Sequence, residues 1–233
     1  MLLAATVIGP APQDGEALIR QMRDRYDGKW YRSLTFVQKT TFEDGRIETW
    51  HEAMRVPGLL RIDIAPIDSS NVLLFRQDSI YVIRGGQTRP ARHMVHPLMV
   101  LGFDVYSDRA ETTIGKLKAL GFDLTKMRED TWQGRAVYVV GAAAGDSTSN
   151  QFWIDKEHLL FVRMLQPGQG GAVAETQFNK YQRLGQGWIA PEVLFLSNGK
   201  VTTREEYGDI RADVTLPDDL FDPKYAKPAW VGR

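Results

Sequence analysis

The sequence SNQFWIDKEHLLFVRML, residues 149–165, decides the fold class. Two runs of strand-forming residues, 151–154 and 159–165, flank the short polar group of residues 155–158. A few turn-tolerant residues between two such runs fold the second strand back on the first. The stretch therefore predicts a β-hairpin.

The second run of this hairpin is expected to be buried mainly on one face. Side chains alternate along a strand, which puts Leu160, Val162 and Met164 together on one face. Arg163 interrupts the opposite face between two apolar neighbours. This pattern is typical of an antiparallel sheet with one buried face and one mixed face.

Further strand signals extend the sheet in both directions. Turn pairs such as Asp44-Gly45 and Asn198-Gly199 separate the runs, and the long polar run 200–214 is predicted to lie near a sheet edge. The number of expected strands exceeds the usual size of a flat sheet, so the sheet should curl. The other expected strands are 30–42, 47–56, 60–64, 71–76, 80–84, 126–131, 135–143, 174–184 and 188–196.

Helical patterns occur at two places. Residues 14–26 predict a first helix, with Asp14 as its cap. Residues 97–103 and 108–120 predict a helical insertion between the two groups of strands, with Asp108 as cap of its second helix. We expect this insertion to reach across the sheet face that the first group of strands leaves open.

Composition excludes several classes of protein. The chain has 233 residues with 29 basic and 29 acidic side chains, so it lacks the excess of cations that nucleic acid binding needs. It has no cysteine, and therefore no disulfide or thiolate metal site. We read residues 1–13, which begin MLLAATVIG, as the end of an export signal or as a frayed strand, and 14–233 as one domain.

No motif for a catalytic centre, metal or cofactor is found. The glycine-rich loop 168–171 lacks the Lys-Ser/Thr of a phosphate loop, and no Gly-x-Ser-x-Gly elbow occurs. His93 and His96 are three residues apart, but a metal site needs further ligands. The basic run with Arg84, Arg89 and Arg92 leaves two readings open, a solvated surface and a contact with an anionic head group or a protein.

The order of elements, together with several short motifs, resembles the LolA/LolB-like lipoprotein-carrier superfamily, and within it the outer-membrane lipoprotein-sorting proteins. The resemblance implies an incomplete β-barrel with a helical lid, and the lack of cysteine matches the soluble carrier branch instead of the membrane-anchored receptor branch. No functional residue of the family is carried over. The matching residues are Gln151-Phe152-Trp153-Ile154-Asp155, Val162-Arg163-Met164, Tyr207, Leu216-Pro217-Asp218 and Phe221-Asp222.

The predicted fold is thus α+β: a single curled antiparallel sheet forming an incomplete β-barrel, with an N-terminal helix and a helical lid insertion. Large apolar residues on the sheet and the insertion would face each other, either around a ligand cavity or in an ordinary core. The insertion is rich in leucine and methionine, which favours the cavity because methionine adapts to ligands of varied shape. The candidate cavity residues are Phe36, Trp50, Met54, Ile62, Leu98, Met99, Leu101, Phe103 and Leu117.

These expectations lead to two hypotheses about function. The leading hypothesis is a non-enzymatic periplasmic carrier of lipid or lipoprotein acyl chains, without a cofactor. Its partners would be a lipid or acylated protein and a membrane-bound donor or receptor, with at most peripheral membrane contact and no nucleic acid. The alternative is a regulatory or sensory binding module of the same fold that recognises a protein partner.

Overall fold

The centre of the molecule is a long strand, β1 (Ser33–Phe42), paired on one side with β2 (Ile47–Arg55) and on the other with β16 (Lys200–Ala212). The computed structural model describes residues 11–224. The pairing joins the N-terminal and C-terminal groups of strands into one sheet. Strand β16 is therefore central, and the prediction that residues 200–214 lie near an edge is wrong.

The described residues form one 14-stranded antiparallel sheet and a separate two-stranded sheet. The remaining strands of the large sheet are β3 (Leu59–Ile64), β4 (Asn71–Arg76), β5 (Ser79–Arg84), β6 (Gln87–Thr88), β7 (Arg92–His93), β8 (Met127–Trp132), β9 (Arg135–Val140), β10 (Gln151–Asp155), β11 (Phe161–Pro167), β12 (Val173–Asn179) and β15 (Glu192–Ser197). Their order is β6-β5-β4-β3-β2-β1-β16-β15-β12-β11-β10-β9-β8, with β7 also paired to β5.

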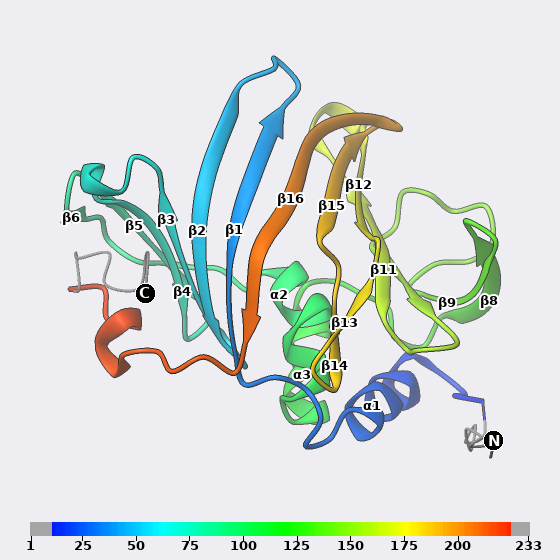
Figure 1. Cartoon of the computed structure of the whole chain (residues 1–233). Coiled ribbons are helices and arrows are strands. Elements are labelled where there is room, and N and C mark those ends of the chain that lie inside the picture. Colours follow the sequence, from blue (N-terminus) through cyan, green and yellow to red (C-terminus); the bar gives the residue numbers. More distant parts are fainter. Residues whose placement is uncertain (1–10, 225–233) are drawn as a thin grey trace.

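Strands β6 and β8 end this order on opposite sides, so the sheet is not closed. It curves around the helices as an open half-barrel (Figure 1). The predicted fold class is confirmed. The small sheet is made of β13 (Gln182–Leu184) and β14 (Gly187–Ile189). Two predicted long strands, 174–184 and 188–196, are therefore each divided in two.

The helices lie together against one face of the sheet. Helix α1 (Gly15–Arg25) begins after Asp14, whose carboxylate accepts a hydrogen bond of 2.8 Å from the Ala17 N–H, as predicted. The insertion contains α2 (Pro97–Gly102), a short 3₁₀ turn η2 (Asp104–Tyr106) and α3 (Ala110–Ala119). The cap of α3 is Arg109 and not Asp108, whose carboxylate instead accepts the Arg109 N–H.

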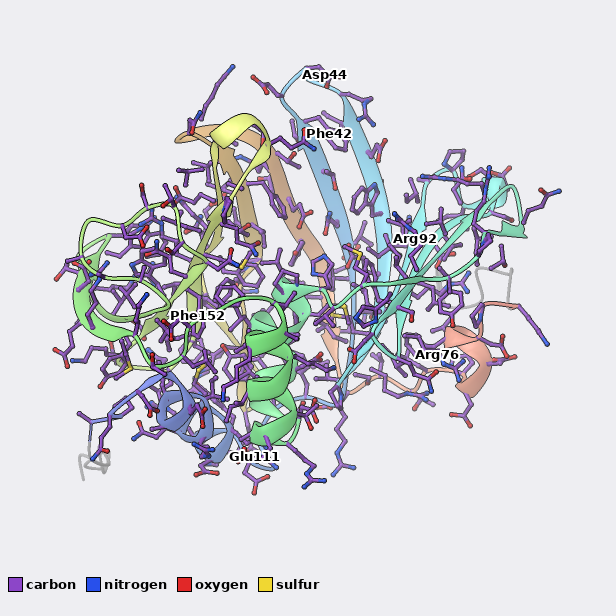
Figure 2. All side chains as sticks on the ribbon, turned by 180° about the vertical axis from the view of Figure 1, so that it is seen from behind. Phe42, Asp44, Arg76, Arg92, Glu111 and Phe152 are labelled. Atoms are coloured by element: carbon purple, nitrogen blue, oxygen red, sulfur yellow. The ribbon has the colours of Figure 1, made fainter. Side chains whose placement is uncertain are left out.

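We call residues 97–119 the lid segment. Arg20 of α1 is paired with Glu111 of the lid segment at 3.2 Å, and the Arg23 side chain donates to the Asp108 carbonyl at 3.0 Å. These two contacts therefore attach the lid segment to helix α1. Figure 2 shows this arrangement from behind, with α3 in front of the strands.

One large apolar cluster lies between the helices and the sheet. It contains Leu18 and Met22 of α1, Leu101 and Leu117 of the lid segment, and Phe152 of β10. We call the face of the sheet that contributes to this cluster the inner face. Even-numbered residues of β1 and β2 belong to it, because side chains alternate along a strand.

The hairpin that decided the fold class carries an irregularity that the sequence did not reveal. Trp153 pairs with Arg163 but Ile154 pairs with Phe161, so β11 has a bulge at Val162. The bulge reverses the alternation. Phe161 therefore joins the inner cluster, whereas Val162 joins a separate outer cluster, and the predicted grouping of Leu160, Val162 and Met164 on one face is wrong.

The segment after β16 covers the outer face of β2–β5. Leu216, Leu220 and Phe221 pack there against Ala53 and Leu74. The Arg61 guanidinium lies beneath this segment, buried, with hydrogen bonds of 2.7 and 2.8 Å to Asp63 and a bond to the Leu220 carbonyl at 3.3 Å. The expected signal remnant lies largely in residues 1–10, outside the described residues.

Candidate functional site

The nine candidate cavity residues lie within the inner apolar cluster or at its border, in packed surroundings. Eight of them are at most 9 % exposed and belong to the inner apolar cluster: Phe36, Met54, Ile62, Leu98, Met99, Leu101, Phe103 and Leu117. The ninth, Trp50, is half-buried at the border of the cluster. Side chains thus fill the volume between the lid segment and the strands beneath it.

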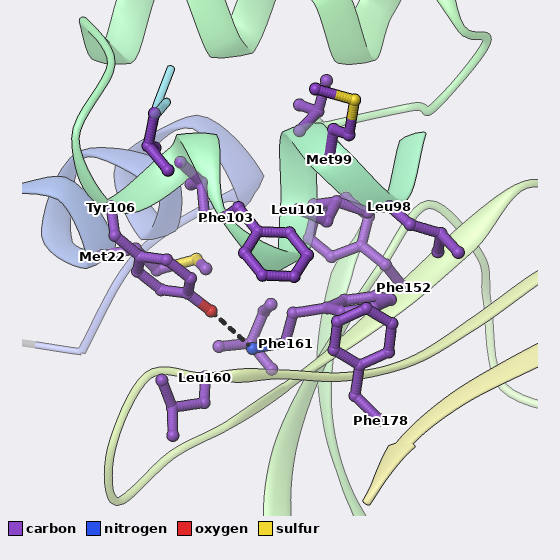
Figure 3. Close-up of a cluster of buried hydrophobic side chains, with 14 of the residues drawn as sticks. Met22, Leu98, Met99, Leu101, Phe103, Tyr106, Phe152, Leu160, Phe161 and Phe178 are labelled. Atoms are coloured by element: carbon purple, nitrogen blue, oxygen red, sulfur yellow. Dashed lines mark hydrogen bonds between the residues drawn. The ribbon is translucent and has the colours of Figure 1, made fainter. Parts of the chain in front are cut away.

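The lid segment fits closely on the strands. Tyr106 is buried, its ring stacks on Trp30 with centroids 3.9 Å apart, and its hydroxyl oxygen accepts the Phe161 N–H at 2.9 Å (Figure 3). A Cβ atom on Gly102 would lie 2.6 Å from the Phe178 ring. Glycine therefore allows the close approach of α2 to β12, because any larger residue would force the Phe178 ring or α2 to shift.

A small cleft of about 20 Å³ remains beside the N-terminus of α2. His96 lines it, and burial lowers the pKa of its imidazole to about 4. Burial also raises the pKa of Asp104 to about 7, against the opposing effect of the Gly58 N–H, which donates to that carboxylate at 3.0 Å. The space holds water at most and is too small for a ligand.

The part of the inner face outside the lid segment differs from the packed region. Its apolar side chains are half-buried, and they continue the inner cluster toward solvent. Trp50 pairs across strands with Ile64, and Leu73 pairs with Val82, so these residues form adjacent rows. We call the whole set the inner-face patch: Trp50, Ile64, Leu73, Val82, Phe195 and Tyr207.

Two carboxyl groups lie on the inner face beside this patch. Glu52 is only 4 % exposed, and no residue in 11–224 donates a hydrogen bond to it. Burial, and to a lesser extent the charge of Glu205, raises the pKa of Glu52 well above its ordinary value. Burial raises the pKa of Glu205 to about 7, although its carboxylate accepts a hydrogen bond from Tyr207 at 3.1 Å. Burial thus favours the protonated form of both carboxyl groups. Sequence spacing does not bring these residues together, because they belong to β2 and β16.

A second cleft, of about 340 Å³, lies beside the β13–β14 hairpin. Its walls combine aromatic and charged side chains, and Trp188 contacts His158 with ring centroids 4.6 Å apart. Sequence patterns do not indicate this cleft, because its lining residues come from several strands and from the break between β12 and β13. The lining residues are Arg135, Asp155, Glu157, His158, Leu160, Val162, Lys180, Tyr181 and Trp188.

The histidine pair of the sequence does not form one site. His93 is exposed in β7, whereas His96 precedes α2 and is partly buried. Among residues 11–224, no group of three or more histidine, aspartate or glutamate side chains is arranged to hold a metal ion. Within the same residues, the helices are too short or too polar to cross a membrane.

Comparison with models of protein families gives no match, and comparison with curated proteins gives none either. Solved structures are similar in fold. A putative outer membrane lipoprotein-sorting protein domain from Vibrio parahaemolyticus has a TM-score of 0.61 and 15 % identity, over 91 % of this chain and 97 % of that one.

Two other solved structures have comparable similarity. A DUF1329 family protein from Desulfovibrio piger has a TM-score of 0.57 and 16 % identity, over 89 % of this chain and 95 % of that one. A LolA superfamily protein from Nitrosomonas europaea has a TM-score of 0.56 and 10 % identity, over 89 % and 97 %. The chain therefore has a LolA-like fold.

Proposed function

We propose that this protein is a carrier that binds an acyl chain of a lipid or of an acylated protein on its inner face, and that it catalyses no reaction. The observation that supports this most directly is the inner-face patch. It consists of large apolar side chains that the lid segment leaves half-buried, next to a fully buried core. A contiguous apolar surface on a curved sheet is the feature that an acyl chain would cover.

The expected gain from chain burial is large enough for tight binding. Each buried methylene contributes about 0.8 kcal/mol, so a long chain contributes on the order of 10 kcal/mol before ordering costs. Trp50 would contact the chain directly. The other eight candidate residues would contact it only after the lid segment moves from the sheet, because their side chains are buried in this structure.

A lipid carrier also requires a cellular location and binding partners. We propose a periplasmic location, with a membrane-bound donor or receptor supplying or accepting the acylated cargo at peripheral contact with the membrane. The LolA-like fold supports this setting because one solved neighbour is described as an outer membrane lipoprotein-sorting domain. Release would follow from competition by the receptor for the same chain.

Binding of a fluorescent fatty acid to delipidated protein tests the proposal. Ile64→Ser and Leu73→Ser place a hydroxyl in the inner-face patch and should each weaken binding several-fold. Ile47→Ser is the matched control, because Ile47 is exposed and its partner Thr41 lies on the outer face. Wild-type protein without saturable uptake would contradict the carrier, as would equal losses in all three variants.

A second function is supported by the filled space beneath the lid segment. A module that recognises a protein partner needs an exposed apolar patch and no internal cavity. The inner-face patch would then receive apolar side chains of the partner. Native mass spectrometry of the purified protein separates the two functions, because a carrier is expected to retain lipid whereas a protein-recognition module is not.

A further inference from the structure

Three arginines lie at one edge of the sheet, outside the inner-face patch. Arg84 ends β5, Arg92 begins β7, and Arg89 lies between β6 and β7. All three side chains are exposed. Within residues 11–224, no carboxylate or other acceptor is bound to any of their guanidinium groups. They are therefore available to an external anion.

The register places these arginines on the inner face. Arg92 pairs with Ile80, which belongs to the inner cluster. Arg84 lies four residues after Ile80 on the same strand, so it shares that face. The Arg89 N–H donates to the Val82 carbonyl at 2.8 Å, which sets Arg89 opposite a residue of the inner-face patch. We call Arg84, Arg89 and Arg92 the arginine rim; Arg92 is labelled in Figure 2.

The arginine rim is continuous with the apolar surface. Val82 belongs to the inner-face patch, has Arg89 opposite it, and precedes Arg84 by two residues on the same face. An apolar row therefore ends directly in cationic groups. This is the arrangement that matches an amphiphile, whose chain and head group are covalently joined.

The local charge is strongly positive, although the whole chain is neutral. Residues 79–103 contain three arginines and no aspartate or glutamate. The preceding acid, Asp78, is paired with Lys116 at 2.8 Å. Because no carboxylate in residues 11–224 forms an ion pair with the rim, its guanidinium groups can attract an external anion. A guanidinium binds phosphate or carboxylate oxygens through paired hydrogen bonds, so these are the groups that fit.

We propose that the arginine rim binds the anionic head group of a lipid whose acyl chain lies on the inner-face patch. This inference rests on the proposed carrier function and adds the class of ligand. The residues of the inner-face patch are themselves apolar or aromatic, and the arginine rim supplies the cationic groups that adjoin it. The head group is therefore directed toward the β5–β7 edge.

The test compares two lysolipids with the same acyl chain. Lysophosphatidylglycerol is anionic and lysophosphatidylcholine is zwitterionic. Each displaces bound N-phenyl-1-naphthylamine from delipidated protein, below its critical micelle concentration, and inorganic phosphate alone is a third competitor. The wild type should bind the anionic lysolipid about tenfold more tightly, with a preference that shrinks as salt is added. Phosphate without a chain should displace nothing.

Two triple variants test which residues cause the preference for the anionic lysolipid. Arg84→Gln/Arg89→Gln/Arg92→Gln should bind both lysolipids alike, with the affinity for the zwitterionic one unchanged. Lys29→Gln/Arg32→Gln/Arg109→Gln removes the same charge from exposed positions elsewhere and should keep the wild-type preference. Far-UV circular dichroism verifies that both variants are folded.

The possible results are distinct. A wild type that binds both lysolipids equally overturns the head-group assignment but leaves chain binding intact. The same holds if the control variant loses the preference for the anionic lysolipid as fully as the rim variant does. Displacement by phosphate alone overturns the assignment in favour of a free-anion site. A wild type that binds neither the dye nor a lysolipid contradicts the carrier function itself, and with it the assignment.

Discussion

The backbone N–H of Phe161 donates a hydrogen bond to the hydroxyl oxygen of Tyr106, at 2.9 Å and fully buried (Figure 3). Phe161 lies at the start of β11, next to the bulge, and Tyr106 lies in the lid segment. One side chain of the lid segment thus completes the hydrogen bonding of the sheet. Sheet and lid segment are therefore energetically coupled.

Replacement of Tyr106 should weaken this coupling. Tyr106→Phe leaves the Phe161 N–H without its acceptor, and an unsatisfied buried donor costs about 1–3 kcal/mol of the free energy of unfolding. Urea denaturation measures the loss. Tyr138→Phe is the control, because no partner in residues 11–224 is bound to the Tyr138 hydroxyl. Equal losses in the two variants would contradict the role of the Tyr106 bond.

Two glycines in the lid segment should respond in opposite directions. Gly102→Ala places a Cβ atom 2.6 Å from the Phe178 ring, and such overpacking costs about 1–3 kcal/mol. Gly115→Ala meets no atom within 4 Å and should stabilise α3 by roughly 0.5–1 kcal/mol. Thermal unfolding distinguishes the two. Phe178→Leu should recover part of the Gly102→Ala loss, and a double variant without any recovery would show that the contact does not limit the approach of α2.

Stability should fall as the pH rises through neutrality. The pKa of Glu205 is raised to about 7 in the folded protein, above its value in the unfolded chain, because the carboxyl group is buried. Between the two pKa values, Glu205 is protonated in the folded state and ionised in the unfolded state. Its contribution to the free energy of unfolding is therefore complete below the unfolded pKa, and it is lost by the time the pH passes 7. Glu52, whose pKa is also raised, adds to the same trend.

Glu205→Gln tests this linkage, because the amide oxygen still accepts the Tyr207 hydrogen bond. The variant should be more stable than the wild type at pH 8, and its free energy of unfolding should decline less steeply between pH 5 and pH 8. Urea titrations across that range measure both. Glu206→Gln removes a neighbouring carboxylate that is paired with Lys39 at 3.6 Å. A flattened profile in this control, and not in Glu205→Gln, would contradict the assignment.

The buried ion pair under the C-terminal segment should be sensitive to loss of one partner. Asp63→Ala removes the carboxylate that accepts two hydrogen bonds from the buried Arg61 guanidinium, and breaking a buried ion pair typically costs about 3–5 kcal/mol. Limited proteolysis should then cut earlier near residues 214–224, since Arg61 also holds the Leu220 carbonyl. Asp218→Ala breaks only the exposed contact with Arg55 and should cost less than about 1 kcal/mol.

Much of the fold followed from local patterns. Alternation located the strands, and Asp14 marked the start of α1 at the residue found. The bulge at Val162 could not be predicted, because it depends on the fit of β11 between β10 and the lid segment. The position of β16 was missed for another reason. Its polar residues resemble those of an edge strand, yet they border the open part of the inner face.

The candidate site was only partly accessible from sequence. Apolar periodicity shows that Met54 and Leu117 are buried, but it does not show whether a ligand or other side chains cover them. The placement of Glu52 and Glu205 on the same face of the sheet required the register of β1 with both of its neighbours. The shared face of the arginine rim likewise depends on how β5, β6 and β7 pair.

The place of β16 between β1 and β15 has a consequence for how the molecule assembles during synthesis. Leu34 can meet its partner Ala212 only after the whole stretch between these two residues has left the ribosome. Until then one side of β1 has unpaired backbone groups, which makes the nascent protein dependent on late, long-range closure and slow to reach its final topology. Premature termination before residue 200 would leave the two groups of strands unconnected and the edge of β1 unpaired and prone to aggregation.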